Sequence, residues 1–214
     1  QVSCTGGANG QANVSASGGM PPYTYLWNTS PLQNSQPATG LSAGNYSVTV
    51  FDNHGCSYTS SVSITEPPAI TAVTNFSGVS CYGGANGSVS VSVSGGVPSY
   101  QYSWSSGQTN ASVSGLPAGT YTVVITDGNG CTRTNTAVIS GPLQLASTNT
   151  TQNISCSGGN NGLASLAVTG GTPPYFYLWN TGQTQATAGG LVAGNYTCTI
   201  TDANGCTATS TVSI

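Results

Sequence analysis

One sequence unit occurs three times along this chain, and the repetition constrains the fold more than any other feature. Cys81, Trp104, Tyr121, Asp127 and Cys131 recur 75 residues later as Cys156, Trp179, Tyr196, Asp202 and Cys206. The first copy supplies Cys4, Trp27, Tyr46, Asp52 and Cys56, with two extra residues between its Trp and its Tyr. Repetition at a fixed period is typical of an array of similar modules. We therefore predict three modules, at residues 1–66, 67–141 and 142–214.

Charge is almost absent from the chain. One basic and four acidic residues make up 2% of its 214 residues, whereas a soluble domain is typically about 25% charged. With Arg133 as its only basic residue and a net charge of −3, the chain has no electrostatic means of binding phosphate. This argues against nucleic acid and against an anionic membrane surface as partners. The apolar runs are only a few residues long, so we expect no membrane insertion in this segment.

Alternating residues indicate β-strands throughout. Ser88–Ser94 places Val on one face and Ser on the other, and Tyr100–Trp104 carries aromatic residues at alternate positions. Further strands are expected at 70–79, 111–116 and 121–126, and a last one begins at Cys131. No window has uninterrupted helical periodicity. The pattern predicts an all-β chain of three tandem immunoglobulin-like or fibronectin-like antiparallel β-sandwich modules.

A Leu-x-Ala-Gly-x-Tyr segment occurs in each copy and ends at Tyr46, Tyr121 and Tyr196. A tight turn that leads into a Tyr resembles the tyrosine corner of such sandwiches, in which the hydroxyl bonds back to the backbone. We expect these three Tyr in the structural core, together with Trp27, Trp104 and Trp179. The Tyr-x-Tyr-x-Trp stripes could instead stack on sugar rings, but inward-facing aromatic residues of a sandwich more often form its core.

Six of the seven Cys form the repeated pattern, with two in each copy. An even, repeated set of this kind predicts disulfides and an oxidising, extracellular compartment. The predicted disulfide residues are Cys4, Cys56, Cys81, Cys131, Cys156 and Cys206. Cys198 stands where the other copies have Val, so we expect it to be a buried free thiol.

The direction of the strands decides how these Cys pair. If successive strands alternate in direction, the four strands between Cys81 and the Asp127 turn return the chain to the same pole. Cys81 can then meet Cys131, as can Cys4 with Cys56 and Cys156 with Cys206. One further strand in that interval would place the two Cys at opposite poles. Disulfides between neighbouring modules would then be expected instead.

Residue types suited to catalysis or metal binding are scarce. Asp52, Asp127 and Asp202 open Asp-x-Asn-Gly-like segments, but the further carboxylates of a calcium loop are missing. An Asp that bonds the backbone of its own turn explains the spacing. His54 is interpreted as a turn residue because it has no second His or paired acid. We therefore expect no metal, no cofactor and no enzymatic activity.

The motifs Cys-x-Gly-Gly-x-Asn-Gly, Gly-Gly-x-Pro-x-Tyr-x-Tyr-x-Trp, Leu-x-Ala-Gly-x-Tyr and Asp-x-Asn-Gly-Cys together resemble the SprB-type repeat of Bacteroidota surface adhesins. In the second copy they stand at Cys81–Gly87, Gly95–Trp104, Leu116–Tyr121 and Asp127–Cys131. The first copy departs from them at His54. The resemblance implies a secreted, multi-repeat adhesin or fibre at the cell surface, exported by the type IX route. It implies no catalytic residues.

These observations predict a structural or adhesive extracellular repeat protein, part of a longer cell-surface adhesin or of a self-assembling surface fibre. The alternative is a multivalent array of carbohydrate-binding modules, whose partner would be a surface polysaccharide. The first copy lacks a first strand, because only Gln1–Ser3 precede Cys4. We expect upstream sequence or a neighbouring chain to supply that strand, which makes self-association by strand addition the leading prediction for partners.

Overall fold

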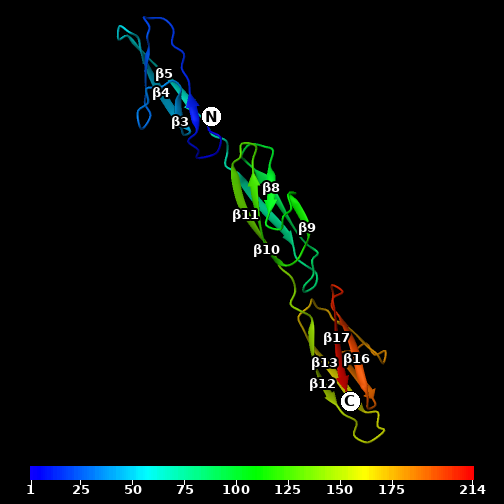
Figure 1. Cartoon of the computed structure of the whole chain (residues 1–214). Helices are drawn as coiled ribbons and strands as arrows, with labels where there is room; N and C mark the ends of the chain where they lie inside the picture. Colours follow the sequence, from blue (N-terminus) through cyan, green and yellow to red (C-terminus); the bar gives the residue numbers. More distant parts are fainter. The chain divides into compact units, whose positions relative to one another are not determined.

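The structure is a computed structural model that describes residues 1–214 (Figure 1). Strands and turns make up the chain, and no residue lies in a helix. The chain divides into two compact units. The first contains residues 1–73, 91–111 and 122–135, and the second contains residues 74–90, 112–121 and 136–214.

The strands recur with the sequence repeat. The first repeat contains β1 (Gly10–Ala12), β2 (Thr24–Trp27), β3 (Ala38–Leu41), β4 (Gly44–Phe51) and β5 (Ser57–Ile64). The second contains β6 (Thr71–Ser77), β7 (Gly87–Ser94), β8 (Gln101–Trp104), β9 (Ser112–Leu116), β10 (Gly119–Thr126) and β11 (Thr132–Ile139). The third contains β12 (Ala146–Gln152), β13 (Gly162–Thr169), β14 (Phe176–Trp179), β15 (Thr187–Leu191), β16 (Asn195–Thr201) and β17 (Thr207–Ser213). The module boundaries at 66/67 and 141/142 stay a prediction.

Two small sheets form in each repeat. Their strand orders are β6-β7-β9 and β11-β10-β8 in the second repeat, and β12-β13-β15 and β14-β16-β17 in the third. In the first repeat they are β1-β3 and β2-β4-β5. The pairs described within the third repeat are all antiparallel. These sheets confirm the predicted all-β fold of tandem immunoglobulin-like sandwiches.

Strand direction fails to alternate at one step. In the third repeat β14 runs antiparallel to β16, and β15 runs antiparallel to β13. The Thr172 N–H donates to Asp202 Oδ2 at 2.8 Å, so β13 and β16 end at the same pole. The consecutive strands β14 and β15 must therefore run in the same direction. One reversal is lost, and the loop before β13 and the turn after β16 lie at opposite poles.

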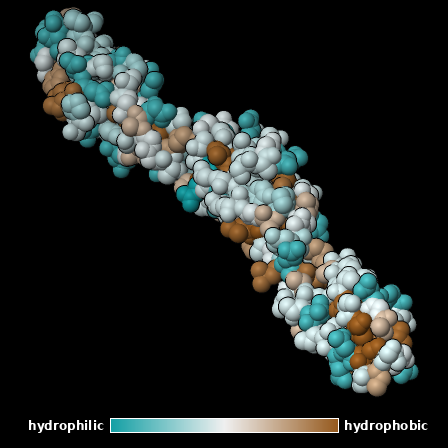
Figure 2. Space-filling view, turned by 60° about the horizontal axis from the view of Figure 1, so that its bottom comes forward, coloured by the Kyte–Doolittle hydropathy of each residue, from teal (hydrophilic) through white to brown (hydrophobic).

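Apolar side chains gather between the sheets. The core of the third repeat consists of Leu145, Ala164, Leu166, Trp179, Ala188, Leu191, Cys198, Ile200 and Val212. The core of the first consists of Val2, Ala12, Trp27, Ala38, Leu41, Val48 and Ile64. Along β17 the Thr residues at 207, 209 and 211 face solvent, as the alternation predicts. The face shown in Figure 2 is mostly white or teal, with small brown patches.

The first repeat has an open sheet edge. Its β1 is three residues long, whereas β7 and β13 at the equivalent position are eight. No strand pairs with β1 in the way that β12 pairs with β13 over seven residues. The adjacent strand β5 is exposed as a consequence. Its Val62 is 36% exposed, while the equivalent Val212 in β17 is only 4% exposed.

Candidate functional site

Two disulfides join each repeat to the next. Cys4 is bonded to Cys131 and Cys81 to Cys206, with Cα–Cα distances of 5.7 Å in both. The predicted pairing within a repeat is therefore wrong for Cys4 with Cys56, for Cys81 with Cys131 and for Cys156 with Cys206. The cause is the lost reversal, which places the two Cys of a repeat at opposite poles. Bonds between neighbouring modules, the other possibility left open by the sequence, are the ones that occur.

Three Cys have no disulfide. Cys56 and Cys156 were predicted to be bonded, yet both are exposed free thiols in the structure. Cys198 is free and buried, at the position where the first repeat has Val48. Burial raises the pKa of the Cys198 thiol, so this side chain stays neutral and packs as a small apolar group.

One half of each junction is a loop that holds its own shape. In the first copy, Asn9 Oδ1 accepts from the Ser3 N–H at 2.9 Å, and Asn9 Nδ2 donates to Ser3 Oγ at 2.7 Å. The Gly7 N–H donates to the Cys4 carbonyl at 2.9 Å, which closes the turn. The same bonds occur in the other two copies, around Asn86 and Asn161. Each loop thus presents a Cys and the Ser carbonyl that precedes it.

The other half is the Asp turn. Asp127 Oδ1 accepts from the N–H groups of Asn129 and Cys131, both at 2.9 Å. Its second oxygen, Oδ2, accepts from the Val97 N–H at 2.9 Å. Asp52 and Asp202 make equivalent sets of three bonds. The Asp residues are therefore structural, and each fixes the position of the Cys four residues after it.

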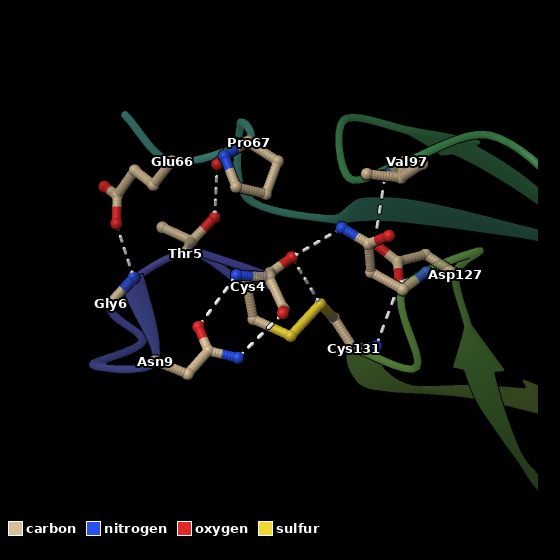
Figure 3. Close-up of a disulfide and its surroundings, with 11 residues drawn as sticks. Cys4, Thr5, Gly6, Asn9, Glu66, Pro67, Val97, Asp127 and Cys131 are labelled. Carbon is tan, nitrogen blue, oxygen red and sulfur yellow. Dashed lines mark hydrogen bonds between the residues drawn. A yellow bond between two sulfur atoms is a disulfide. The ribbon is translucent and has the colours of Figure 1, made fainter. Parts of the chain in front are cut away.

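Loop and turn meet through more than the disulfide (Figure 3). Asn129 Nδ2 donates to the Ser3 carbonyl at 2.9 Å, and Cys131 Sγ lies 3.3 Å from the same oxygen. At the second junction Asn204 Nδ2 donates to the Ser80 carbonyl, also at 2.9 Å. The repeated Asn therefore docks the loop beside the disulfide, which makes the two junctions chemically equivalent.

The connector between the first two repeats, residues 65–70, is part of the first junction, and residues 140–145 form the equivalent connector between the second and third repeats. Thr5 Oγ1 donates to the Pro67 carbonyl at 2.7 Å, and Glu66 accepts from the Gly6 N–H at 2.6 Å, as Figure 3 shows. The Pro68 carbonyl accepts from the Gly96 N–H at 2.7 Å. The connector is thus held on both sides, by the loop of one repeat and by the double glycine of the next.

Backbone donors lower the pKa of all three Asp carboxyls. The Met20 N–H has the largest effect on Asp52, and the Val97 N–H has the largest effect on Asp127. For Asp202 the largest effect is burial, which raises the pKa, but its backbone donors outweigh it. Hydrogen bonds to the ionised form favour ionisation. The charged Asp is therefore the form that stabilises the turn.

Acid should remove this stabilisation. Because the folded pKa lies below the unfolded one, the contribution is complete above about pH 5 and is lost as the pH falls below about 4. Asp127→Asn should lower stability at pH 7, since the amide nitrogen cannot accept the Val97 N–H. The difference from the unsubstituted chain should shrink by pH 2–3, where the unsubstituted Asp is protonated as well. Thermal unfolding measured across this range checks the prediction, and a difference that does not vary with pH would contradict it.

The aromatic residues of the motifs lie in or beside the cores. Trp27, Trp104 and Trp179 are 1%, 3% and 1% exposed, so their indole rings are not available to stack on sugars. Each Trp ring N–H donates to a backbone carbonyl, at 2.9–3.1 Å. The hydroxyls of Tyr46, Tyr121 and Tyr196 donate to the carbonyls four residues earlier, which is the bond of a tyrosine corner.

No other arrangement suggests chemistry. His, Cys, Asp and Glu form no group of three or more that could hold a metal ion. No helix is long and apolar enough to cross a membrane. The sequence motif includes the loop Asn at 9, 86 and 161, five residues after each first Cys, but sequence reasoning gave this residue no role. Sequence reasoning also assigned no contact to Asn129 and Asn204, which touch the preceding repeat.

Comparison with known proteins identifies the repeat. A family model described as SprB repeat matches residues 1–32, 73–109 and 148–184, one segment in each copy. No curated protein has a significant match to the chain. The matched segments contain the loop Cys and the Tyr-x-Tyr-x-Trp strand of every copy, so the family resemblance inferred from the motifs is confirmed.

Solved immunoglobulin structures resemble the chain at low identity. A structure of three Ig domains of titin is 13% identical, with 97% of this chain and 92% of that chain covered and a TM-score of 0.39. The eight N-terminal Ig domains of Down Syndrome Cell Adhesion Molecule are 11% identical, with 98% of this chain and 34% of that chain covered and a TM-score of 0.32. This chain therefore spans about a third of that structure. An amphioxus IgVJ-C2 molecule is 16% identical, with 65% of this chain and 99% of that chain covered and a TM-score of 0.31. The fold assignment rests on the strand pairing described above. This chain is built from SprB-type repeats.

Proposed function

We propose that this chain is a structural and adhesive segment of an extracellular repeat protein, part of a cell-surface adhesin or fibre, and that it has no catalytic role. The observation that carries the proposal is the position of the two disulfides. Both join consecutive repeats, so they reinforce the connections of the array rather than the interior of a module. A protein that transmits force between a surface and a target needs strong connections of this kind.

Three further features support an extracellular structural role. Disulfides persist in oxidising compartments outside the cytoplasm. The exposed residues are nearly all uncharged, and Ser and Thr are frequent among them, as along β5. The features that recur in every copy, namely the loop, the Asp turn and the buried Trp, serve the modules and their junctions.

Surface labelling of intact cells tests this function. An antibody raised against the chain should label the cells that make the protein without permeabilisation, and deletion of its gene should lower their attachment under flow. An antibody against a cytoplasmic protein, which should label only permeabilised cells, serves as the control. Labelling that appears only after permeabilisation would overturn the proposal, and so would unchanged attachment of the deletion strain.

A further inference from the structure

The two exposed free thiols, Cys56 and Cys156, belong to opposite halves of the same kind of junction. In both closed junctions the Cys of a loop is bonded to the Cys of the Asp turn in the following repeat. Cys156 lies in the loop of the third repeat, and Cys56 follows the Asp turn of the first. The chain therefore carries one unused loop and one unused turn.

The unused loop already has the conformation of the bonded ones. Asn161 Oδ1 accepts from the Ser155 N–H at 3.1 Å, and Asn161 Nδ2 donates to Ser155 Oγ at 2.6 Å. The Gly159 N–H donates to the Cys156 carbonyl at 2.9 Å. Because these bonds match those around Cys4 and Cys81, the loop needs no partner to form and is ready to present its thiol.

The unused turn is formed as well. Asp52 Oδ1 accepts from the N–H groups of His54 and Cys56 at 2.9 Å, as Asp127 and Asp202 do in the closed junctions. His54 occupies the position of Asn129 and Asn204, whose side chains dock the loop carbonyl. An imidazole N–H can donate the same bond. The turn thus offers a thiol and a donor to an incoming loop.

The surface beside this turn is open where the other repeats are covered. Gly19 follows Gly18 there, and an added Cβ on Gly18 would meet nothing within 4 Å. At the equivalent Gly95 and Gly170 it would overlap a carbonyl oxygen of the connector. A cavity of about 400 Å³ lies next to Cys56 and is lined by residues 14–19 and by side chains of β4 and β5. Within residues 1–214, the face beside the Cys56 turn is therefore uncovered.

We propose that copies of this chain join head to tail through a disulfide between Cys156 of one copy and Cys56 of the next. Any SprB-type repeat carries the half that fits, whether it stands on the same polypeptide or on another, and a second copy of this chain supplies both halves. Loop and turn are different surfaces, so the contact is heterologous and generates an open array rather than a closed dimer. This inference deepens the proposed function and rests on it for the compartment in which the bond forms.

The bond requires an oxidant, which we take to be a small disulfide such as oxidised glutathione. One protein thiolate attacks glutathione disulfide and releases one reduced glutathione, which leaves a mixed disulfide. The second protein thiolate then attacks the protein sulfur and releases the other glutathione. Two protein thiols are oxidised to one disulfide, one glutathione disulfide is reduced to two thiols, and both protons pass to the released glutathione.

Complementary variants test the pairing. The full chain with its two disulfides intact is incubated with oxidised glutathione, and the products are separated on non-reducing gels. The unsubstituted chain should give a ladder of covalent oligomers, and peptide mapping should find Cys56 bonded to Cys156. Cys56→Ser and Cys156→Ser should each stay monomeric alone, and their equimolar mixture should stop at the dimer. Cys198→Ser, the matched control, should leave the ladder unchanged.

Several outcomes would overturn the proposal. One is a Cys156–Cys156 dimer that forms from Cys56→Ser alone as fast as the mixture of the two variants reacts. Another is a Cys56–Cys156 bond within one molecule. The third is a folded mixture that forms the Cys56–Cys156 bond no more readily than the same mixture unfolded in urea. His54→Asn should keep the rate, whereas His54→Ala should slow it about threefold to tenfold, since one docking hydrogen bond is lost. Equal rates for both would remove His54 from the junction. Because surface labelling does not depend on oligomers, failure here leaves the proposed function standing.

Discussion

The oxidised chain should extend to only about a third of the length of the reduced chain when it is pulled from its two ends. The shortest covalent path from Gln1 to Ile214 crosses both disulfides and follows the backbone only over residues 1–4, 81–131 and 206–214. At about 3.5 Å per residue, that path reaches about 210 Å, against about 750 Å for the reduced chain. Optical-tweezers extension with end tags, after alkylation of the free thiols, measures both lengths.

Single-bond variants make this test specific. In Cys4→Ser only the loop closed by Cys81 and Cys206 is protected, so the final length should lie between the two extremes. Cys198→Ser should extend like the unsubstituted chain, because Cys198 forms no disulfide. An oxidised chain that reaches the full reduced length would show that the cross-repeat bonds are not present in solution.

Gly170→Ala should destabilise the third repeat far more than Gly18→Ala destabilises the first. Both glycines have φ in the left-handed region, at +69° and +81°. An alanine in this region costs about 1–2 kcal/mol at either site. At Gly170 the new Cβ would also overlap the Gln144 carbonyl oxygen of the connector, whereas at Gly18 it meets nothing. Displacing packed backbone adds about 1–3 kcal/mol, so we expect about 2–5 kcal/mol in total at Gly170.

Hydrogen exchange of the full chain can localise this effect. The connector leads into β12, so Gly170→Ala should raise exchange of the β12 amides by about 30-fold or more. Exchange in the first repeat should stay as it is, which provides an internal control. In Gly18→Ala, β12 should be unaffected, and β3 and β4 should change by about 30-fold at most. Equal effects of the two substitutions would contradict the close packing of the connector on the double glycine.

Most of the fold could be predicted from local patterns, because each pattern has a direct physical cause. The Val–Ser alternation of residues 88–94 gave β7 to within one residue. The segment ending at Tyr121 gave the hydroxyl bond to the Pro117 carbonyl, at 2.9 Å. These features depend on residues close together in sequence. A period of two or a Gly-containing turn is enough to specify them.

The disulfide partners could not be predicted in the same way. They depend on whether the chain reverses between Trp179 and β15, and a short segment without periodicity does not encode that direction. There the Trp179 N–H donates to the Gln183 carbonyl at 2.9 Å, and the chain crosses to the other sheet without starting a strand of opposite direction. A single missing reversal moved every partner to the neighbouring repeat. The candidate site was therefore missed although all of its Cys had been identified.

The overlap of the two disulfide loops keeps the chain covalently connected after a single cleavage. One loop spans residues 4–131 and the other spans residues 81–206, so every peptide bond between Cys4 and Cys206 lies inside at least one of them. A protease that nicks either connector leaves both fragments covalently attached. A fragment is released only after a second cut or after reduction of the disulfide that holds it. A protein that is exposed to proteases outside the cell, where it cannot be replaced quickly, would therefore stay attached after a single cleavage.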